Sequence, residues 1–428
     1  MLIAICVAQP DRLVDPQAGE RPTLVLTLQQ VLDRARNGSQ TMALYDQRIE
    51  TAEARLGETR GFFGTTLATS YRSTPTLAFD DTGYLYTNIA RVQLGQSLSR
   101  LWLRFPEIKE DRLHLAAQKE RVRGAEERSA ELVWAQYIAC QEALELYRLA
   151  QKAVEVEDKH LRRVEAKRGQ ALALEDDVLV AQRRVMTWRA EALTQLGHWE
   201  NAVLALNQLI GEAPDTDIWY GTLDKTTEIA GRAQQIELEI EPEVLVDAAS
   251  ASPAVHALAL ERDALRAASR ANAVWMPRLS LVAGYEWRQS LRATGNDGRG
   301  FFYGGTFSFP LLDIGAHQAR VRRYRSLQAE LDFERVLEEE KELSGLFGLR
   351  REVQRQLELV RVYSKHVDAT RASLALEQER LRKGIGDPLV ALDREVDLIR
   401  AQSTLVSEQA ALILDFARIE NRLALRAR

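Results

Sequence analysis

The sequence predicts a mainly α-helical protein with a small membrane β component, built from a structural unit that occurs twice. Three observations support this fold class. Two very long stretches have helical composition and no proline, sequence landmarks recur half a chain length apart, and short segments alternate apolar and polar residues. Together they predict long antiparallel helices and two β-hairpins, one hairpin in each copy of the unit.

The composition agrees with long helices and excludes one class of partner. Among 428 residues there are only 11 prolines, and Ala, Leu, Glu, Arg and Gln are abundant. The 57 basic and 62 acidic side chains nearly balance, so we expect no nucleic-acid partner. The two cysteines, Cys6 and Cys140, predict no disulfide, because one lies in the leader-like start and the other in a helical pattern.

The first 24 residues (1–24) are interpreted as leader-like or disordered. Met1 to Ala8 is apolar but lacks a basic start, and Cys-Val-Ala before Gln9 resembles a cleavage site. We expect Met1 to lie inside a longer signal; the alternative is a disordered terminus. Ile5 before Cys6 disfavours lipidation, although the sequence does not decide whether the signal is truncated or lipidated.

The internal repeat organises the rest of the chain. Residues 67–71 (LATSY) echo residues 281–285 (LVAGY), and Gly169 pairs with Gly384 at nearly the same offset. The first repeat is predicted to span 25–211 and the second 242–428, joined by a linker or equatorial segment at 212–241. A period this long indicates duplication of a whole unit and not a solenoid.

Four strands are expected, at about 64–73 and 84–98 in the first repeat and 277–288 and 300–311 in the second. In the second pair one face is apolar and aromatic and the other small or polar, as in strands with lipid outside and water inside. The residues predicted to face lipid are Leu281, Tyr285, Trp287, Phe301, Tyr303 and Phe307. The alternative for each hairpin alone is an ordinary soluble one, and the first pair is the weaker.

Four strands cannot close a membrane barrel. Unpaired backbone groups at an open sheet edge cost several kcal/mol each in hydrocarbon, and closed barrels begin at about eight strands. A barrel built from these hairpins must therefore be shared between subunits.

The long helices are predicted at about 107–168 and 174–210, and again at about 316–383 and 388–425. As one helix, 107–168 would extend about 90 Å at 1.5 Å per residue. The last helix carries a heptad seam of apolar or small residues: Leu389, Leu392, Val396, Ile399, Ser403, Val406, Ala410, Ile413 and Ala417. A generic coiled coil would explain these helices but not the inserted hairpins.

Several segments, in order, resemble the TolC-type outer-membrane efflux protein family over nearly the whole chain. The segments that carry the resemblance are Leu26–Leu32, Pro277–Leu281, Phe307–Gly315 and Arg382–Asp393. The resemblance implies a homotrimer with a 12-strand β-barrel in the outer membrane of a Gram-negative bacterium and a 12-helix α-barrel in the periplasm. It also implies a passive conduit in a tripartite efflux or type I secretion system, with a periplasmic adaptor (membrane fusion) protein and an inner-membrane pump of RND, ABC or MFS type.

The resemblance also assigns candidate residues. It places the adaptor contact at two tip turns, here Gly169, Ala171, Leu172, Gly384, Gly386 and Asp387. Asp393 matches one of two acidic positions that ring the closed aperture, whereas Val390 occupies the other, which puts a double carboxylate ring in doubt. Whether Asp393 gates the aperture, which substrate is exported and which pump is used do not follow from the sequence.

No enzyme, cofactor or metal chemistry is expected. The six histidines are scattered, and no nucleophile, phosphate-loop or dinucleotide motif is present. The acidic runs 175–177 and 338–340 are interpreted as solvated faces or first-turn partners of a helix dipole. The alternative function from another class is a periplasmic coiled-coil adaptor or scaffold protein.

Overall fold

A computed structural model describes residues 24–61, 65–77, 84–213, 216, 218–220, 242–272, 278–290, 298–308 and 314–424. Apart from Leu24, the predicted leader at 1–24 lies outside the described residues. So do most of the predicted linker at 212–241, Pro277, and residues 309–313 of the Phe307–Gly315 motif.

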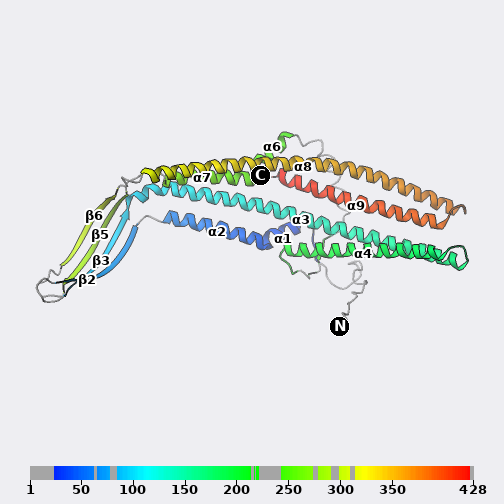
Figure 1. The fold of residues 1–428 in the computed structure, drawn as a ribbon, viewed down its shortest axis with the longest axis horizontal. Coiled ribbons are helices and arrows are strands. Elements are labelled where there is room, and N and C mark those ends of the chain that lie inside the picture. The colour runs from blue at the N-terminus through cyan, green and yellow to red at the C-terminus, as the bar shows by residue number, and fades with distance from the viewer. Residues whose placement is uncertain are drawn as a thin grey trace. The chain divides into compact units, whose positions relative to one another are not determined.

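The two halves of the chain contain the same elements in the same order (Figure 1). Each half has shorter helices, a pair of strands and then two long helices. In the first half these are α1 (Leu28–Gly38), α2 (Gln40–Gly61), β2 (Thr65–Leu77), β3 (Tyr84–Ser97), α3 (Leu98–Gly169) and α4 (Glu175–Leu209). In the second half they are α6 (Pro242–Ser250), α7 (Pro253–Asn272), β5 (Arg278–Ser290), β6 (Gly298–Ser308), α8 (Ile314–Arg382) and α9 (Pro388–Ala424). The predicted mainly helical chain with a small β component is confirmed.

The helix α3 begins earlier than the sequence suggested. We expected it to start after Pro106, but it follows β3 directly at Leu98 and contains Pro106. A proline inside a helix removes one backbone hydrogen bond and crowds the preceding turn. In a helix of 72 residues that local loss does not end the element.

The chain folds into two compact units, and each unit takes segments from both repeats. One consists of Met1–Ala43, Ala125–Ala249 and Leu343–Arg428, and the other of Leu44–Gly124 and Ser250–Glu342. We call the first the turn unit and the second the sheet unit. The helices α3 and α8 contribute to both. The packing units therefore combine segments from both predicted repeats.

The sheet unit contains a four-stranded sheet in the order β2-β3-β5-β6. Every neighbouring pair is antiparallel, so β3 and β5 join the two predicted hairpins into one sheet. Within this sheet β2 and β6 each have one edge without a partner strand.

The turn unit is held by apolar clusters between its helices. The β1 strand (Leu24–Val25) pairs in parallel with β4 (Ile218–Trp219), and next to them Val31, Val133 and Leu206 are fully buried. The predicted seam of α9 is confirmed by burial. Its buried members are Leu392, Val396, Ile399, Ala410, Ile413 and Ala417. All of these except Ala417 pack in clusters with α3, whereas the α9 residues outside the seam, Leu412, Phe416 and Ile419, pack with α8.

Candidate functional site: an uncovered sheet and a pair of helical turns

The sheet has two chemically different faces. Residues directly opposite each other on neighbouring strands point to the same side. Tyr285 lies opposite Phe301, and Leu279 lies opposite Phe307. The register therefore places all six residues predicted to face lipid on one face, together with Leu67 and Tyr71 of β2 and Val92 and Leu94 of β3.

This apolar face lies open in the single chain. Phe301 is 87% exposed and Tyr303 is 91% exposed. The rings of Tyr285 and Phe301 meet edge to face, with their centroids 5.1 Å apart. Among the described residues of the sheet unit, Figure 1 shows no helix lying over the sheet. An exposed apolar surface of this kind marks a site of interaction with another protein or with a membrane.

The opposite face is polar and carries one carboxylate that two arginines contact. Arg91 of β3 donates from Nε to Glu286 of β5 at 3.0 Å, and Arg288 donates to the same carboxylate at 3.1 Å. The guanidinium of Arg91 also lies 5.0 Å from the centre of the Phe302 ring. Gly284 gives that ring its space, because a Cβ at this position would approach the ring to within 2.6 Å.

The turns α3–α4 and α8–α9 share one hydrogen-bond pattern. In the first turn the amides of Ala171 and Leu172 donate to the carbonyls of Arg168 and Lys167, at 2.8 and 2.9 Å. In the second, Gly384 and Ile385 donate to the carbonyls of Leu381 and Arg380, at 3.0 and 3.1 Å. Both are Schellman motifs, which require a residue with positive φ just after the helix.

The residues with positive φ are Gly384 (φ 76°) and Ala171 (φ 58°). We paired Gly169 with Gly384 from the sequence, but Gly169 is the last residue of α3 and does not hold this position. The left-handed conformation is easy for glycine and strained for alanine. The prediction from glycine spacing therefore placed the positive-φ residue of the first turn two residues too early.

Each turn exposes an apolar side chain at the same place in its motif. Leu172 is 72% exposed and Ile385 is 77% exposed, and Leu174 is exposed beside the first turn. Ile385 and Leu174 were not among the predicted tip residues. A recurring apolar residue directly after the residue with positive φ could have indicated Ile385, but it does not mark Leu174. The two turns therefore present matched apolar tips.

Asp387 fixes the start of α9. One oxygen of Asp387 accepts a hydrogen bond from the Leu389 amide at 2.9 Å, and the other lies 3.4 Å from Nζ of Lys167 on α3. The amide hydrogen bond and then the Lys167 charge lower the pKa of Asp387. Gly386 lies close to the backbone of α8, since a Cβ there would be 2.9 Å from the Leu381 nitrogen. Pro388 is the first residue of α9, where its missing N–H has no cost.

The structure places Asp393 in a cluster of charged groups between three helices. Arg184 of α4 donates to Asp393 at 2.7 Å and lies 3.9 Å from Glu157 of α3. His160 of α3 lies 3.8 Å from Asp393 through Nε2. Glu157 is 1% exposed, and neither of its carboxyl oxygens has a hydrogen-bond partner among the described residues.

Burial controls the protonation of this cluster. Burial raises the pKa of Glu157, an effect that Arg184 and Arg400 oppose and Asp393 reinforces. Burial also lowers the pKa of His160, helped by Arg184 and Arg163 and opposed by Asp393 and Asp387. Both groups are thus shifted toward their neutral forms beside the Arg184–Asp393 ion pair.

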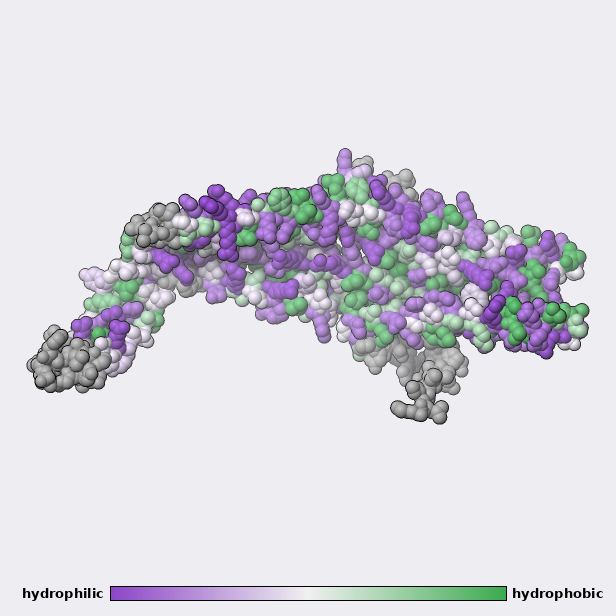
Figure 2. All heavy atoms as spheres, viewed as in Figure 1, coloured by the Kyte–Doolittle hydropathy of each residue, from purple (hydrophilic) through white to green (hydrophobic). Residues whose placement is uncertain are grey.

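The rest of the described chain shows little sign of reaction chemistry. No group of three or more His, Cys, Asp or Glu side chains in these residues is placed to hold a metal ion. Cys140 is buried, and burial raises the pKa of its thiol to about 12, so it is not a reactive thiolate. None of the helices in the described ranges is both long and apolar enough to cross a membrane. Figure 2 shows mostly hydrophilic residues on the helices, with scattered apolar ones.

Comparison with known proteins gives a match in structure but not in sequence. No protein-family model matches the chain. No curated protein matches it by sequence either. Solved structures match over nearly the full length. The outer-membrane channel OprN matches with a TM-score of 0.74 at 16% identity, over 92% of this chain and 89% of that one.

Two further solved structures give the same result. The outer-membrane protein VceC of Vibrio cholerae has a TM-score of 0.71 at 16% identity, covering 92% of this chain and 95% of its own. The open-state outer-membrane channel MtrE of Neisseria gonorrhoeae has a TM-score of 0.72 at 16% identity, covering 92% and 88%. The chain therefore has the TolC-type fold that the sequence resemblance predicted.

The first prediction concerns the conformation of the turns. Gly384→Ala should destabilise the α8–α9 turn by about 1–2 kcal/mol, because an alanine must then adopt positive φ. Amide hydrogen exchange in the turn peptide should become roughly five to thirty times faster. Gly169→Ala is the matched control, since a Cβ at Gly169 meets open space in a helix. Equal exchange in both variants would contradict the assignment. Ala171→Gly should slow exchange in the α3–α4 turn.

The second prediction concerns the pH dependence that Glu157 causes. Its pKa is raised above 4.5 in the folded protein, so its stabilising contribution is complete below pH 4.5 and is lost as pH rises through the raised pKa. Glu157→Gln should therefore be more stable than the wild type at pH 8, by about 1 kcal/mol, with that advantage disappearing toward pH 4. The measurement is the difference in thermal unfolding temperature between the two proteins at each pH in this range. Taking the difference cancels the opposing effect of His160, because both proteins contain it.

The exposed carboxylate Glu155 on the same helix provides the control for that measurement. Glu155→Gln should show no such trend. A Glu157→Gln curve parallel to the wild type would rule out the buried carboxyl as its cause.

Proposed function

We propose that this chain is one subunit of an outer-membrane export channel, a passive conduit from the periplasm to the exterior. The observation that carries the proposal is the uncovered sheet, which has one aromatic and apolar face, one polar face with the Arg91–Glu286 ion pair, and two unpaired edges. Lipid on one side and water on the other satisfy both faces at once.

Strand direction supports closure between copies. The four strands alternate in direction, so β6 of one copy and β2 of the next can pair in the antiparallel sense that runs through the sheet. Three copies would supply a closed barrel of twelve strands, above the minimum of about eight. In the proposed trimer the long helices form a periplasmic extension of the barrel, the 12-helix α-barrel.

The solved structures with the same fold are described as outer-membrane channels, which favours this role over the alternative. A periplasmic adaptor or coiled-coil scaffold would leave Phe301, Tyr303 and their neighbours in water. We further propose that the channel works in a tripartite efflux or type I secretion system with an inner-membrane pump of RND, ABC or MFS type. Neither the pump class nor the cargo is assigned.

The two turns are the proposed contact for a periplasmic adaptor protein. Their exposed apolar residues, Leu172 and Ile385, occupy equivalent places in the two motifs. An adaptor could therefore meet both hairpins of a subunit with the same kind of surface. The neighbouring residues proposed for this contact are Gly169, Ala171, Gly384, Gly386 and Asp387.

Asp393 is the proposed aperture residue, and its ion pair suggests how it would act. Arg184 and Asp393 connect α4 to α9, one helix from each long hairpin, close in sequence to the turns. The side chain of Asp393 remains 42% exposed while it is paired. Breaking this link would remove one of the contacts that hold the two hairpins together near their turns, where Lys167 and Asp387 form another.

The lipid-facing assignment can be tested with two adjacent residues of β2. Tyr71 lies on the apolar face and Ser70 on the opposite one. Tyr71→Arg should make membrane insertion less favourable by about 2–4 kcal/mol, if Tyr71 lies at the depth of the bilayer centre. Ser70→Arg should insert normally. The measurement is recovery of heat-modifiable oligomers from outer-membrane extracts. Equal recovery of both variants, or a wild-type monomer that is soluble without detergent, would end the channel proposal.

The aperture role has a separate test in planar bilayers. Asp393→Ala and Arg184→Ala should each raise single-channel conductance by removing the same link, and the double variant should add little to either. Glu155→Gln serves as a control on the same set of helices. If conductance and cation preference stay at the wild-type values, Asp393 has no gating role, although the conduit itself would stand.

A further inference from the structure

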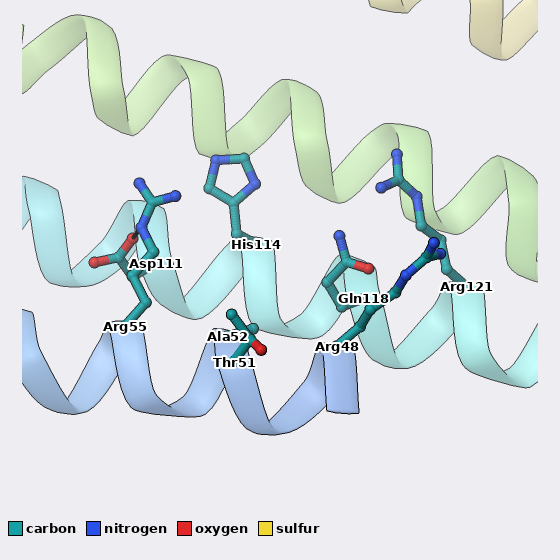
Figure 3. Close-up of a pocket in the computed structure, with 8 residues that line it drawn as sticks. All are labelled: Arg48, Thr51, Ala52, Arg55, Asp111, His114, Gln118 and Arg121. Carbon is teal, nitrogen blue, oxygen red and sulfur yellow. Dashed lines mark ion pairs between the residues drawn. The ribbon is translucent and has the colours of Figure 1, made fainter. Parts of the chain in front are cut away.

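A cavity of about 400 Å³ lies between α2 and α3 in the sheet unit. Figure 3 shows the side chains that surround it. Its lining is polar and rich in arginine: Arg48, Thr51, Ala52, Arg55, Asp111, His114, Gln118 and Arg121. The small side chains of Thr51 and Ala52 leave room on the α2 side. None of these residues belongs to the sheet face or to the turns.

The single carboxylate in the lining already has partners within the protein. Asp111 is 5% exposed, and its two oxygens accept hydrogen bonds from Nε of Arg55 at 2.8 Å and from the Thr59 hydroxyl at 2.5 Å. Asp111 therefore neutralises Arg55 and leaves the other two arginines of the cavity uncompensated by any acid in the lining.

Arg121 is partly committed elsewhere. One of its terminal nitrogens lies 2.5 Å from Glu261 of α7. A guanidinium has five N–H donors in a planar fork, so an ion pair through one nitrogen leaves other donors available. Figure 3 shows Arg121 of α3 and Arg48 of α2 reaching the same end of the cavity, with Gln118 beside them.

Arg48 carries the uncompensated charge. Its guanidinium lies over the ring of Tyr45, 5.2 Å from the ring centre. Among the residues that the structure describes, no ion pair neutralises it, whereas Arg55 and Arg121 each have an acidic partner. Two guanidinium groups at one end of a cavity repel each other when no anion lies between them.

The remaining polar groups are suited to a negative guest. Burial, Arg55 and Arg121 lower the pKa of His114, against the opposing charges of Glu261 and Asp111, and its Nε2 lies 3.9 Å from Glu110. The amide of Gln118 and the hydroxyl of Thr51 supply neutral hydrogen-bond donors. The cavity thus combines two arginines at one end with uncharged donors.

We propose that this cavity binds a phosphate group, with Arg48 and Arg121 as its charged ligands and Gln118 and Thr51 as neutral donors. Arginine suits this task because its planar fork matches the oxygens of a phosphate in a bidentate way. The volume exceeds that of a phosphate alone and leaves room for an attached group. Free phosphate and the headgroup of a phospholipid share this chemistry. The proposal does not depend on the channel function.

The test is isothermal titration of the purified full-length chain in a neutral detergent with inorganic phosphate. Saturable binding is expected, and Arg48→Gln should weaken it about tenfold or more, since hydrogen bonds to charged groups are among the strongest. Arg322→Gln is the matched control, because Arg322 is exposed on α8 and lies outside the lining. Equal affinity of the wild type and Arg48→Gln, or no saturation with any phosphate probe, would overturn the proposal.

A second variant tests the cavity without altering charge. Ala52→Leu should fill the space between α2 and α3 and abolish binding, while circular dichroism verifies that the helices are intact. Titration with a soluble short-chain phosphatidic acid identifies the source: tighter binding than inorganic phosphate indicates a lipid headgroup, and equal or weaker binding indicates free phosphate. Retained phosphate binding in Ala52→Leu would exclude this cavity as the site.

Discussion

The constraint on which the rest of the structure depends is the pairing of backbone groups at the edges of β2 and β6. A four-stranded sheet with one apolar face leaves a row of N–H and C=O groups at each side. In water such edges invite aggregation, and in hydrocarbon each unpaired group costs several kcal/mol. In the proposed channel only other copies of the chain satisfy these edges, so membrane insertion and oligomer formation are one requirement.

Periodicity made most of the fold predictable. Alternation over β5 and β6 was enough to assign the six apolar residues to one face, because strand geometry leaves a side chain only two directions. The seam of α9 followed from its heptad spacing for a similar reason. The pairing of β3 with β5 was not predicted, since it joins segments far apart in the chain and no local pattern specifies it.

The features that sequence reasoning missed depend on tertiary contacts or on strain. Ala171 adopts positive φ although a glycine stands two residues before it, because the hydrogen bonds of the turn fix the position and not the residue type. Asp393 was a candidate from the resemblance alone, and its partner Arg184 was not predicted because it lies on a helix far away in sequence. The burial of Glu157 was equally invisible, since a glutamate in a charged helix normally faces water.

Each subunit contributes an even number of strands, four, and that parity has a consequence for assembly. The first and last strands of the sheet run in opposite directions, so a ring of any size repeats the same antiparallel junction. The direction of the strands therefore places no restriction on the number of subunits. In the proposed assembly the number of subunits is set by circumference instead. The ring of long helices must have the same circumference as the β-barrel that it joins.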